Sequence, residues 1–159
     1  MSSARSMDLI LWRHAEAQVA MEGQPDADRT LTAKGERQAQ RMGEWLSQRL
    51  AESTRVLASP TVRTQQTVRA LGRSFKTVPA LGPDGTVDQL LAAARWPDAG
   101  EPVLVVGHQP TLGMVVARLL ADVDQSWSVK KGAVWWLRYR ERDGDGQVVL
   151  QAMQGPDLL

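Results

Sequence analysis

Short apolar runs alternate with segments of helical spacing along this chain. Four runs have the length of buried strands, at residues 9–12, 56–58, 75–78 and 103–106. Helical spacing begins after each of them, at Thr32, Ser59-Pro60, Val87 and Pro110. Thr32 and Ser59 are the expected N-caps of the first two helices, with Pro60 as the first residue of the second. Two later strands, 133–139 and 148–153, flank a turn at residues 143–146. The pattern predicts an α/β fold, a three-layer sandwich whose central sheet is mostly parallel with an antiparallel edge.

Composition adds that the chain is an ordinary globular protein. Its 159 residues suit a single domain over 1–159, with residues 1–7 expected to form a flexible N-terminal extension. The net charge is +1, and the basic residues are scattered among acidic ones, so the sequence predicts no nucleic-acid partner. No apolar stretch approaches the roughly 20 residues that span a bilayer. We therefore expect no membrane association, no secretory signal and a cytoplasmic location.

The absence of cysteine excludes several kinds of chemistry. Without a cysteine the chain can form no disulfide, no thiolate nucleophile and no cysteine zinc site. Only two histidines are present, which argues against a histidine-based zinc site. We therefore expect a protein that works without a metal or another cofactor.

Both histidines come directly after predicted strands. His14 follows strand 9–12 with Arg13 beside it, and His108 follows strand 103–106. The carboxyl ends of parallel strands meet at one edge of a sheet, so both should lie there. Arg63, on the first turn of the helix after strand 56–58, should join them. Helix N-termini attract anions and arginine matches phosphate oxygens, so this edge predicts a phosphate site. Taken singly, each residue is as well explained as a hydrogen-bonding or surface group.

Four segments, in this order, resemble the motifs of the histidine phosphatase superfamily. The first resembles its Arg-His-Gly signature, and the others its Leu-Thr-x-x-Gly, Ser-Pro-x-x-Arg-x-x-Gln-Thr and second-histidine motifs. In this chain they are Leu11 to Ala17, Leu31 to Gly35, Ser59 to Thr67 and Val105 to Pro110. The resemblance implies a phosphoglycerate-mutase-like fold and a phosphatase activity.

Two details refine this resemblance. Many members carry a helical insert between the Ser-Pro-x-x-Arg helix and the second histidine, but Arg63 and His108 are too close in sequence for one. The chain therefore resembles the small phosphohistidine phosphatases of the SixA type, whose open site accepts a phosphorylated histidine on another protein. The family glycine after the first histidine is Ala15 here. One added methyl group is small enough that we expect activity to be kept.

The resemblance also implies roles for the site residues. His14 is the expected nucleophile, forming a covalent phosphohistidine. Arg13 and Arg63 are the expected clamps on the phosphoryl oxygens, and His108, in its protonated form, is a further donor. These cations take the place of a metal.

Arg29 and Glu16 are two further candidates for the site. Arg29 corresponds to an arginine that precedes the Leu-Thr motif in SixA-type members, which implies a contact with substrate. Glu16 is the nearest carboxylate to the nucleophile in sequence, and it is either a general acid or the partner of a site arginine.

The expected partner is a phosphorylated histidine-containing protein of a phosphorelay or phosphotransfer system. A small phosphate ester is the alternative substrate, and a non-catalytic phosphate-binding module is the third hypothesis.

Overall fold

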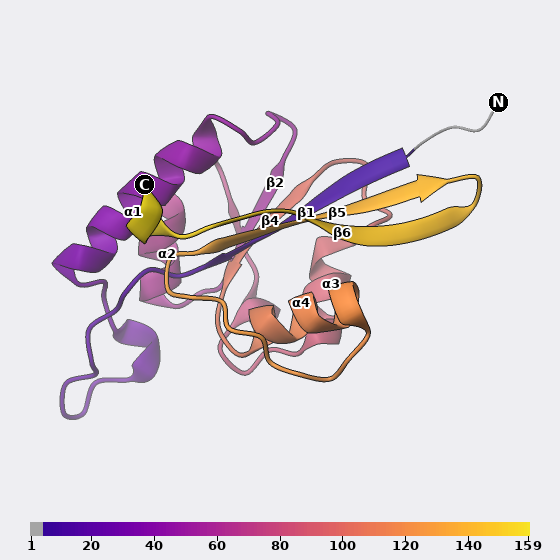
Figure 1. The fold of residues 1–159 in the computed structure, drawn as a ribbon. Coiled ribbons are helices and arrows are strands. Elements are labelled where there is room, and N and C mark those ends of the chain that lie inside the picture. The colour runs from indigo at the N-terminus through magenta and orange to yellow at the C-terminus, as the bar shows by residue number, and fades with distance from the viewer. Residues whose placement is uncertain (1–4) are drawn as a thin grey trace.

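The computed structural model describes residues 5–159, and its strands join in one mixed sheet (Figure 1). The strands are β1 (Arg5–Arg13), β2 (Arg55–Ala58), β3 (Lys76–Thr77), β4 (Val103–Gly107), β5 (Val134–Arg142) and β6 (Asp145–Gln154). Their order across the sheet is β3-β2-β4-β1-β5-β6. The first four are parallel, while β5 runs antiparallel to both of its neighbours. The predicted parallel sheet with an antiparallel edge is confirmed.

Helices cover both faces of this sheet (Figure 1). They are α1 (Ala33–Ser47), α2 (Val62–Arg69), α3 (Val87–Ala94) and α4 (Thr111–Ala121), with short 3-10 helices η1 (Asp26–Asp28), η2 (Pro79–Leu81) and η3 (Pro156–Leu158). The helices α1 and α2 pack on one face, and α3 and α4 pack on the other. The predicted three-layer sandwich is therefore confirmed. No helix within residues 5–159 has the length and apolar character needed to cross a membrane.

The central strand β1 serves both cores. Leu9 and Leu11 point into the core under α3 and α4, while Ile10 and Trp12 point into the core under α1 and α2. All four side chains are fully buried. Because successive side chains of a strand face opposite sides, a strand with a helix layer on each side must be apolar throughout. The buried apolar run therefore stops at Trp12, and the polar residues of the site begin at Arg13, the last residue of the strand.

Of the first two helix starts, one agrees with the sequence prediction and one differs from it. The first helix begins as expected after Thr32, whose hydroxyl accepts a hydrogen bond from the Gly35 amide at 2.9 Å. The second does not begin at Ser59, because its N-cap is Thr61 and its first residue is Val62. The predicted capping role of Ser59 is therefore wrong, and its hydroxyl is used in the site described below.

The amino end of β1 is longer than predicted. Residues 5–7, expected to be part of a flexible extension, pair with β5 and belong to β1, while residues 1–4 lie outside the described part. The hairpin of β5 and β6 turns at Asp143 and Gly144, which both have positive φ, as a two-residue hairpin turn requires. The predicted hairpin is confirmed, and it projects beyond the helices (Figure 1).

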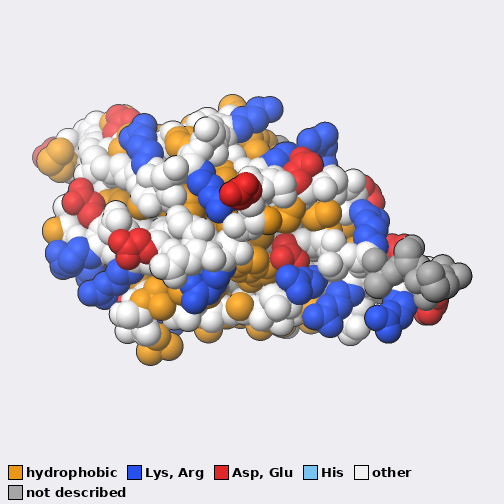
Figure 2. Space-filling model, turned by 90° about the horizontal axis from the view of Figure 1, so that it is seen from above, with side chains coloured by type: hydrophobic (Ala, Val, Ile, Leu, Met, Phe, Trp, Pro, Cys, Tyr) orange, Lys and Arg blue, Asp and Glu red, His pale blue; other side chains and the backbone are white. Residues whose placement is uncertain are grey.

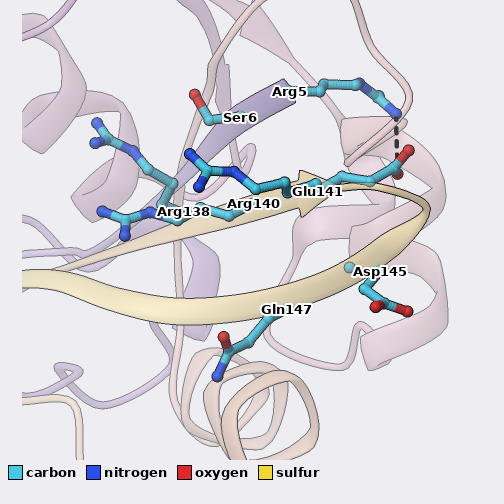
Figure 3. Close-up of a pocket in the computed structure, with 9 residues that line it drawn as sticks. Arg5, Ser6, Arg138, Arg140, Glu141, Asp145 and Gln147 are labelled. Carbon is cyan, nitrogen blue, oxygen red and sulfur yellow. Dashed lines mark ion pairs between the residues drawn. The ribbon is translucent and has the colours of Figure 1, made fainter. Parts of the chain in front are cut away.

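This projecting end carries a cluster of arginines. Arg5, Arg138 and Arg140 line a groove of about 540 Å³ there together with Glu141 and Asp145, and Arg5 lies 4.0 Å from Glu141 (Figure 3). From above, Lys and Arg side chains are mixed with Asp and Glu side chains over the visible face (Figure 2). Basic and acidic groups thus stay interspersed on this face.

Candidate active site

Three strand ends meet at the edge of the sheet opposite the projecting hairpin. Arg13 pairs with Gly107 in the register of β1 and β4, and the His14 amide donates to the Gly107 carbonyl at 3.1 Å. The Ser59 amide, just after β2, donates to the Val106 carbonyl at 3.1 Å. The ring centroids of His14 and His108 consequently lie 5.2 Å apart. The prediction that the two histidines share one edge is confirmed.

His14 is held in one tautomer. Its Nδ1 lies 2.7 Å from the carbonyl oxygen of Ala15, and that oxygen can only accept a hydrogen bond. Nδ1 therefore carries the proton of the neutral ring, and Nε2 keeps a free lone pair. Burial first, and then the charges of nearby arginines, lower the pKa of His14 from 6.5 to about 4, although the hydrogen bond to Ala15 opposes this change. At neutral pH the ring is uncharged and has the form of a nucleophile.

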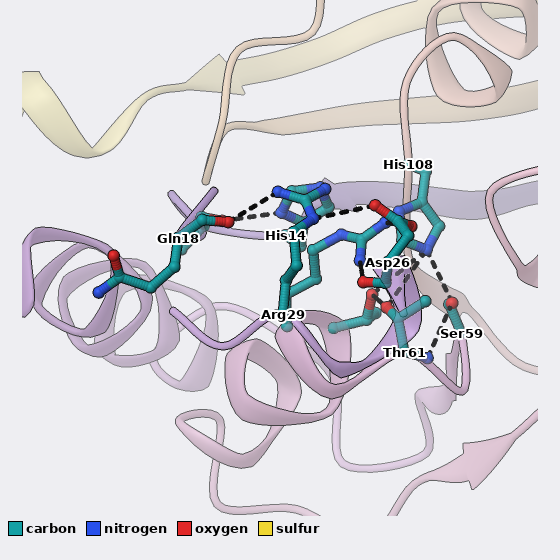
Figure 4. Close-up of polar contacts among 10 residues, drawn as sticks. His14, Gln18, Asp26, Arg29, Ser59, Thr61 and His108 are labelled. Carbon is teal, nitrogen blue, oxygen red and sulfur yellow. Dashed lines mark hydrogen bonds and ion pairs between the residues drawn. The ribbon is translucent and has the colours of Figure 1, made fainter. Parts of the chain in front are cut away.

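His108 lies in a pocket of hydroxyl groups (Figure 4). Its Nε2 is 2.7 Å from Ser59 Oγ, 3.4 Å from Thr64 Oγ1 and 3.5 Å from Thr61 Oγ1. Burial and then the charge of His14 lower the pKa of His108 to about 3. The ring is therefore neutral at pH 7 in this structure, and the expected protonated form of His108 stays a prediction. The hydroxyl groups around it supply no negative charge that would favour protonation.

Arg63 is buried beside the histidines and tied to η1. Its side chain is 3% exposed, and it donates through Nη1 to the Asp26 carbonyl at 2.9 Å and through Nη2 to Asp26 Oδ2 at 3.0 Å. Arg29 donates through Nε to the other carboxylate oxygen of Asp26 at 2.9 Å (Figure 4). Burial acts to raise the pKa of Asp26, but these bonds outweigh it and lower that pKa. One carboxylate thus holds two site arginines in place.

Arg13 is anchored by the loop before β5. Its Nη1 donates to the Val129 carbonyl at 2.9 Å, and burial lowers its pKa. The Nε groups of Arg13 and Arg63 are buried, and neither has a hydrogen-bond partner among residues 5–159. A buried N–H group without a partner costs free energy. An oxyanion bound between the two guanidinium groups would remove that cost.

Arg29 and Glu16 have different surroundings. Besides Asp26, Arg29 binds the Gln18 carbonyl at 3.0 Å, which brings it into the arginine network. Glu16 instead accepts a hydrogen bond from the Thr32 hydroxyl at 2.8 Å, at the start of α1. Within residues 5–159 it forms no ion pair with an arginine, which argues against the salt-bridge alternative. The side chain contacts the helix start, and these contacts support a structural part for it.

Ala15 fits without the freedom of glycine. It is fully buried, and its methyl group packs in a small cluster with Leu31 and Ala39. Its amide donates to Thr67 Oγ1 at 3.0 Å, and its φ is not positive. The alanine therefore adopts an ordinary backbone conformation and gains a packing contact.

The sequence interpretation missed several polar residues of the site. Asp26 lies in a loop without periodicity, where no local signal marks it. The hydroxyl residues Thr61, Thr64 and Thr67 recur at three-residue spacing and are 0–2% exposed, with Thr64 and Thr67 on α2 and Thr61 capping it. That spacing of polar residues on one helical face is a signal that could have revealed them. Together they place a polar lining beside His108 and Ala15.

The arrangement suits transfer of an anionic group to nitrogen. A neutral imidazole with a free Nε2 lies among three arginines that carry fixed positive charge. Within residues 5–159, no group of three or more histidine or carboxylate side chains is placed to hold a metal ion. Positive charge acts on His14 from the guanidinium groups of Arg63, Arg13 and Arg29.

Comparison with known proteins relates this chain to one family. A model described as the histidine phosphatase superfamily (branch 1) matches residues 9–83. The phosphohistidine phosphatase SixA of Escherichia coli (strain K12) is 33% identical over 121 residues, which cover 71% of this chain and 74% of SixA. A SixA homolog from Haemophilus influenzae is 32% identical over 130 residues, covering 71% and 77% of the two chains.

Solved structures agree with the sequence matches. A SixA structure from Nakamurella multipartitia has a TM-score of 0.77 and 32% identity, covering 96% of this chain and 97% of the other. The protein histidine phosphatase SixA complexed with tungstate has a TM-score of 0.79 and 27% identity, covering 96% and 99%. With its fold, its motifs and these relatives in agreement, the chain belongs to the histidine phosphatase superfamily.

Proposed function

We propose that this histidine phosphatase removes the phosphoryl group from phosphohistidine on another protein, with His14 as the nucleophile. The observation that carries the proposal is the fixed tautomer of His14, whose Nδ1 is held 2.7 Å from the Ala15 carbonyl. This leaves Nε2 unprotonated beside the buried Arg63. The similarity to the SixA proteins, which are named as phosphohistidine phosphatases, supports the substrate class.

The reaction has two steps. In the first, Nε2 of His14 attacks phosphorus, the bond from phosphorus to the substrate imidazole breaks, and its electron pair stays on the leaving nitrogen. In the second, water attacks phosphorus of the phosphoryl group on His14, and the new P–N bond breaks with its electron pair returning to Nε2. Inorganic phosphate then leaves carrying the protons of the attacking water. Covalent catalysis of this kind divides one difficult step into two easier ones.

Arg13, Arg29 and Arg63 are the proposed clamps on the phosphoryl oxygens. Charge in the transition state is spread over those oxygens, so preorganised donors accelerate the reaction. The unpartnered Nε groups of Arg13 and Arg63 support this part, because they offer donors that the protein itself does not use. A SixA neighbour complexed with tungstate, a tetrahedral oxyanion, agrees with an oxyanion site in this fold.

His108 is proposed as a donor to the same oxygens. Its Nε2 faces the Ser59 hydroxyl at 2.7 Å, and a neutral ring can still donate one hydrogen bond. A bound phosphoryl group would raise the pKa of His108 by its negative charge. The neutral ring of the free protein is therefore compatible with a donor role once substrate is bound.

The nature of the leaving group supports phosphohistidine over a phosphate ester. An alkoxide needs a proton from a general acid, whereas an imidazole is a better leaving group and can be protonated in advance. Glu16 was the sequence candidate for that acid, and its carboxylate is engaged by Thr32. A substrate that needs no strong acid fits the groups that lie around His14.

A paired substrate assay tests the proposal. Wild-type protein and the His14→Ala variant are compared on a histidine-phosphorylated phosphotransfer domain and on small phosphate esters, and the phosphoryl-enzyme is trapped by acid-free quenching. We expect turnover of the phosphoprotein by wild type and none by the variant. Equal or faster turnover of small esters would favour a phosphomonoesterase, and phosphate binding without any turnover would favour a binding module.

A further inference from the structure

A second surface feature lies next to the candidate active site. A groove of about 200 Å³ is formed where the start of β5, the end of β6 and the C-terminal turn meet, and we call it the apolar groove. Its apolar lining comes from Trp135, Met153, Pro156 and Leu158. Figure 1 shows the end of β6 lying beside the start of β5, in agreement with the pairing of these strands.

The lining of the apolar groove is unusually open to solvent. Met153 is 54% exposed and Leu158 is 88% exposed, although large apolar side chains are usually buried. Trp135 is half-buried beside Met153, its direct partner across the two strands. Clustered apolar groups that water can reach are typical of a surface on which another molecule packs.

Basic groups stand at the rim of the apolar groove. Lys130 and Lys131 are both exposed and line it, and neither forms an ion pair within residues 5–159. One carboxylate, Asp157, also lines the groove, so the rim carries more positive than negative charge. An occupant with apolar side chains on one face and acidic side chains beside them would match both features.

The loop that forms this rim also holds the proposed nucleophile. Its Val129 carbonyl accepts from Arg13 at 2.9 Å, and its Gly132 amide donates to the His14 carbonyl at 3.0 Å. Lys130 and Lys131 lie between these two contacts in sequence. A molecule seated in the apolar groove would therefore lie one loop away from the reacting group.

We infer that the apolar groove docks an amphipathic, acidic segment of the phosphorylated substrate protein while its phosphohistidine reaches His14. The inference rests on the proposed function and adds a second contact, which a small ester is too small to make. Contact area beyond the reacting group raises affinity for the protein substrate alone. The groove thus distinguishes a phosphoprotein from a small phosphate compound.

Substitutions in the apolar groove test this inference. Met153→Glu and Leu158→Glu are assayed with a histidine-phosphorylated phosphotransfer domain and with free phosphohistidine. Leu150→Glu is the matched control, since Leu150 is 46% exposed on the same strand but does not line the groove. We expect KM for the phosphoprotein to rise by roughly tenfold or more in the two groove variants, a change of about 1.4 kcal/mol. Values for free phosphohistidine and for Leu150→Glu should stay at wild-type levels.

The charged rim gives a second readout. The double variant Lys130→Gln and Lys131→Gln should lose part of the salt dependence of kcat/KM for the phosphoprotein, because rim charges mainly affect association. Unchanged KM for the phosphoprotein in folded groove variants would overturn the inference, as would equal losses on both substrates. A change of oligomeric state in Met153→Glu would assign the groove to self-association and overturn it too. Failure of the proposed function itself appears separately, as wild-type protein that leaves the phosphoprotein intact.

Discussion

The two ends of β1 each gather arginines, but they build different surfaces. At the carboxyl end, Arg63 is 3% exposed, and its charge and that of Arg13 act on two buried histidines. These histidines are His14 and His108 (Figure 4). At the amino end, Arg5 is 41% exposed and Arg138 is 29% exposed, and they line an open groove with nearby carboxylates (Figure 3). Both ends carry similar charge, so the number of arginines does not distinguish them.

Burial and the state of each donor make the difference. Arg138 donates through Nε and Nη2 to the Asp8 carboxylate, at 2.6 and 3.0 Å, and this pairing raises the pKa of Arg138. Arg13 and Arg63 keep a buried Nε without a partner within residues 5–159. Water and salt screen the electrostatic interactions of charges at an exposed surface, whereas those of a buried donor are screened much less. A site for an oxyanion therefore needs buried donors left unsatisfied, and neither Arg5 nor Arg138 at the far end has such a donor.

Removing one arginine from each end should give the largest difference in kcat/KM between two variants. Arg63→Ala should lower kcat/KM on the order of 10²–10³-fold, the usual cost of losing one donor to a transition-state oxyanion. Arg140→Ala is the control from the far end, because Arg140 is exposed and forms no ion pair within residues 5–159. Its kcat/KM should stay within roughly twofold of wild type, since an exposed charge is screened at that distance.

Steady-state kinetics on the phosphorylated carrier domain measure both variants, and circular dichroism checks that each is folded. A loss in Arg140→Ala as large as that in Arg63→Ala would remove the distinction between the two ends. It would mean that the far arginines take part in substrate binding.

The protonation of the two histidines offers a second test. Burial lowers the pKa of His14 to about 4 and that of His108 to about 3, both below the ordinary 6.5. The folded protein should thus bind these protons only in acid, while the unfolded chain binds them near pH 6.5. Stability is full above pH 6.5 and falls as pH drops through the window from about 6.5 to the folded pKa values.

Ring-carbon NMR titration measures the two pKa values directly, because the chain has no other histidine. The His108→Gln variant leaves only His14 and assigns its signal. Inorganic phosphate should raise both pKa values by placing negative charge beside the rings. A free-protein pKa near 6.5 for His14 would show that water reaches the ring, and it would weaken the case for a buried nucleophile.

The ends of the buried strands could be predicted from the sequence for a simple reason. A strand covered on both faces must be apolar throughout, so its last residue is marked where polar residues begin. This locates Arg13 at the end of β1, His14 directly after it and His108 after β4, and parallel pairing brings them together. The physical rule acts within a few residues, which is the range that a sequence pattern records.

Contacts between distant segments could not be predicted in the same way. Asp26 holds Arg63 across 37 residues, and nothing in the aperiodic loop around Asp26 marks that pairing. Ser59 has the local signature of an N-cap, but its hydroxyl is taken by His108, 49 residues away. In both cases a tertiary hydrogen bond is added to a local one, and only the assembled site reveals it.

The start of β1 was missed for a related reason. Residues 5–7 read as a polar extension, yet they pair with β5 through their backbone groups. Backbone pairing is indifferent to side-chain polarity at an exposed sheet end. A hydrophobic pattern marks the buried part of a strand and leaves its exposed part invisible.

The smallest of these effects is a stability change at the amino end of β1. Asp8 is 14% exposed and accepts three hydrogen bonds, two from Arg138 and one at 2.9 Å from Trp136 Nε1. Asp8→Ala leaves a buried indole N–H and a guanidinium group without their acceptor. We expect a loss of about 2 kcal/mol in the free energy of unfolding, from urea titrations followed by tryptophan fluorescence.

The same variant should keep kcat/KM within roughly twofold of wild type, because residues 9–12 of β1 separate Asp8 from Arg13 at the site edge. Arg140→Ala, which breaks no ion pair within residues 5–159, serves as the stability control. A fall in kcat/KM with unchanged stability would mean that β1 transmits changes from one end to the other. Loss of stability with intact turnover would instead mean that Arg138 stabilises β1 through Asp8 and takes no part in the reaction. Catalysis would then depend on the buried Arg13 and Arg63.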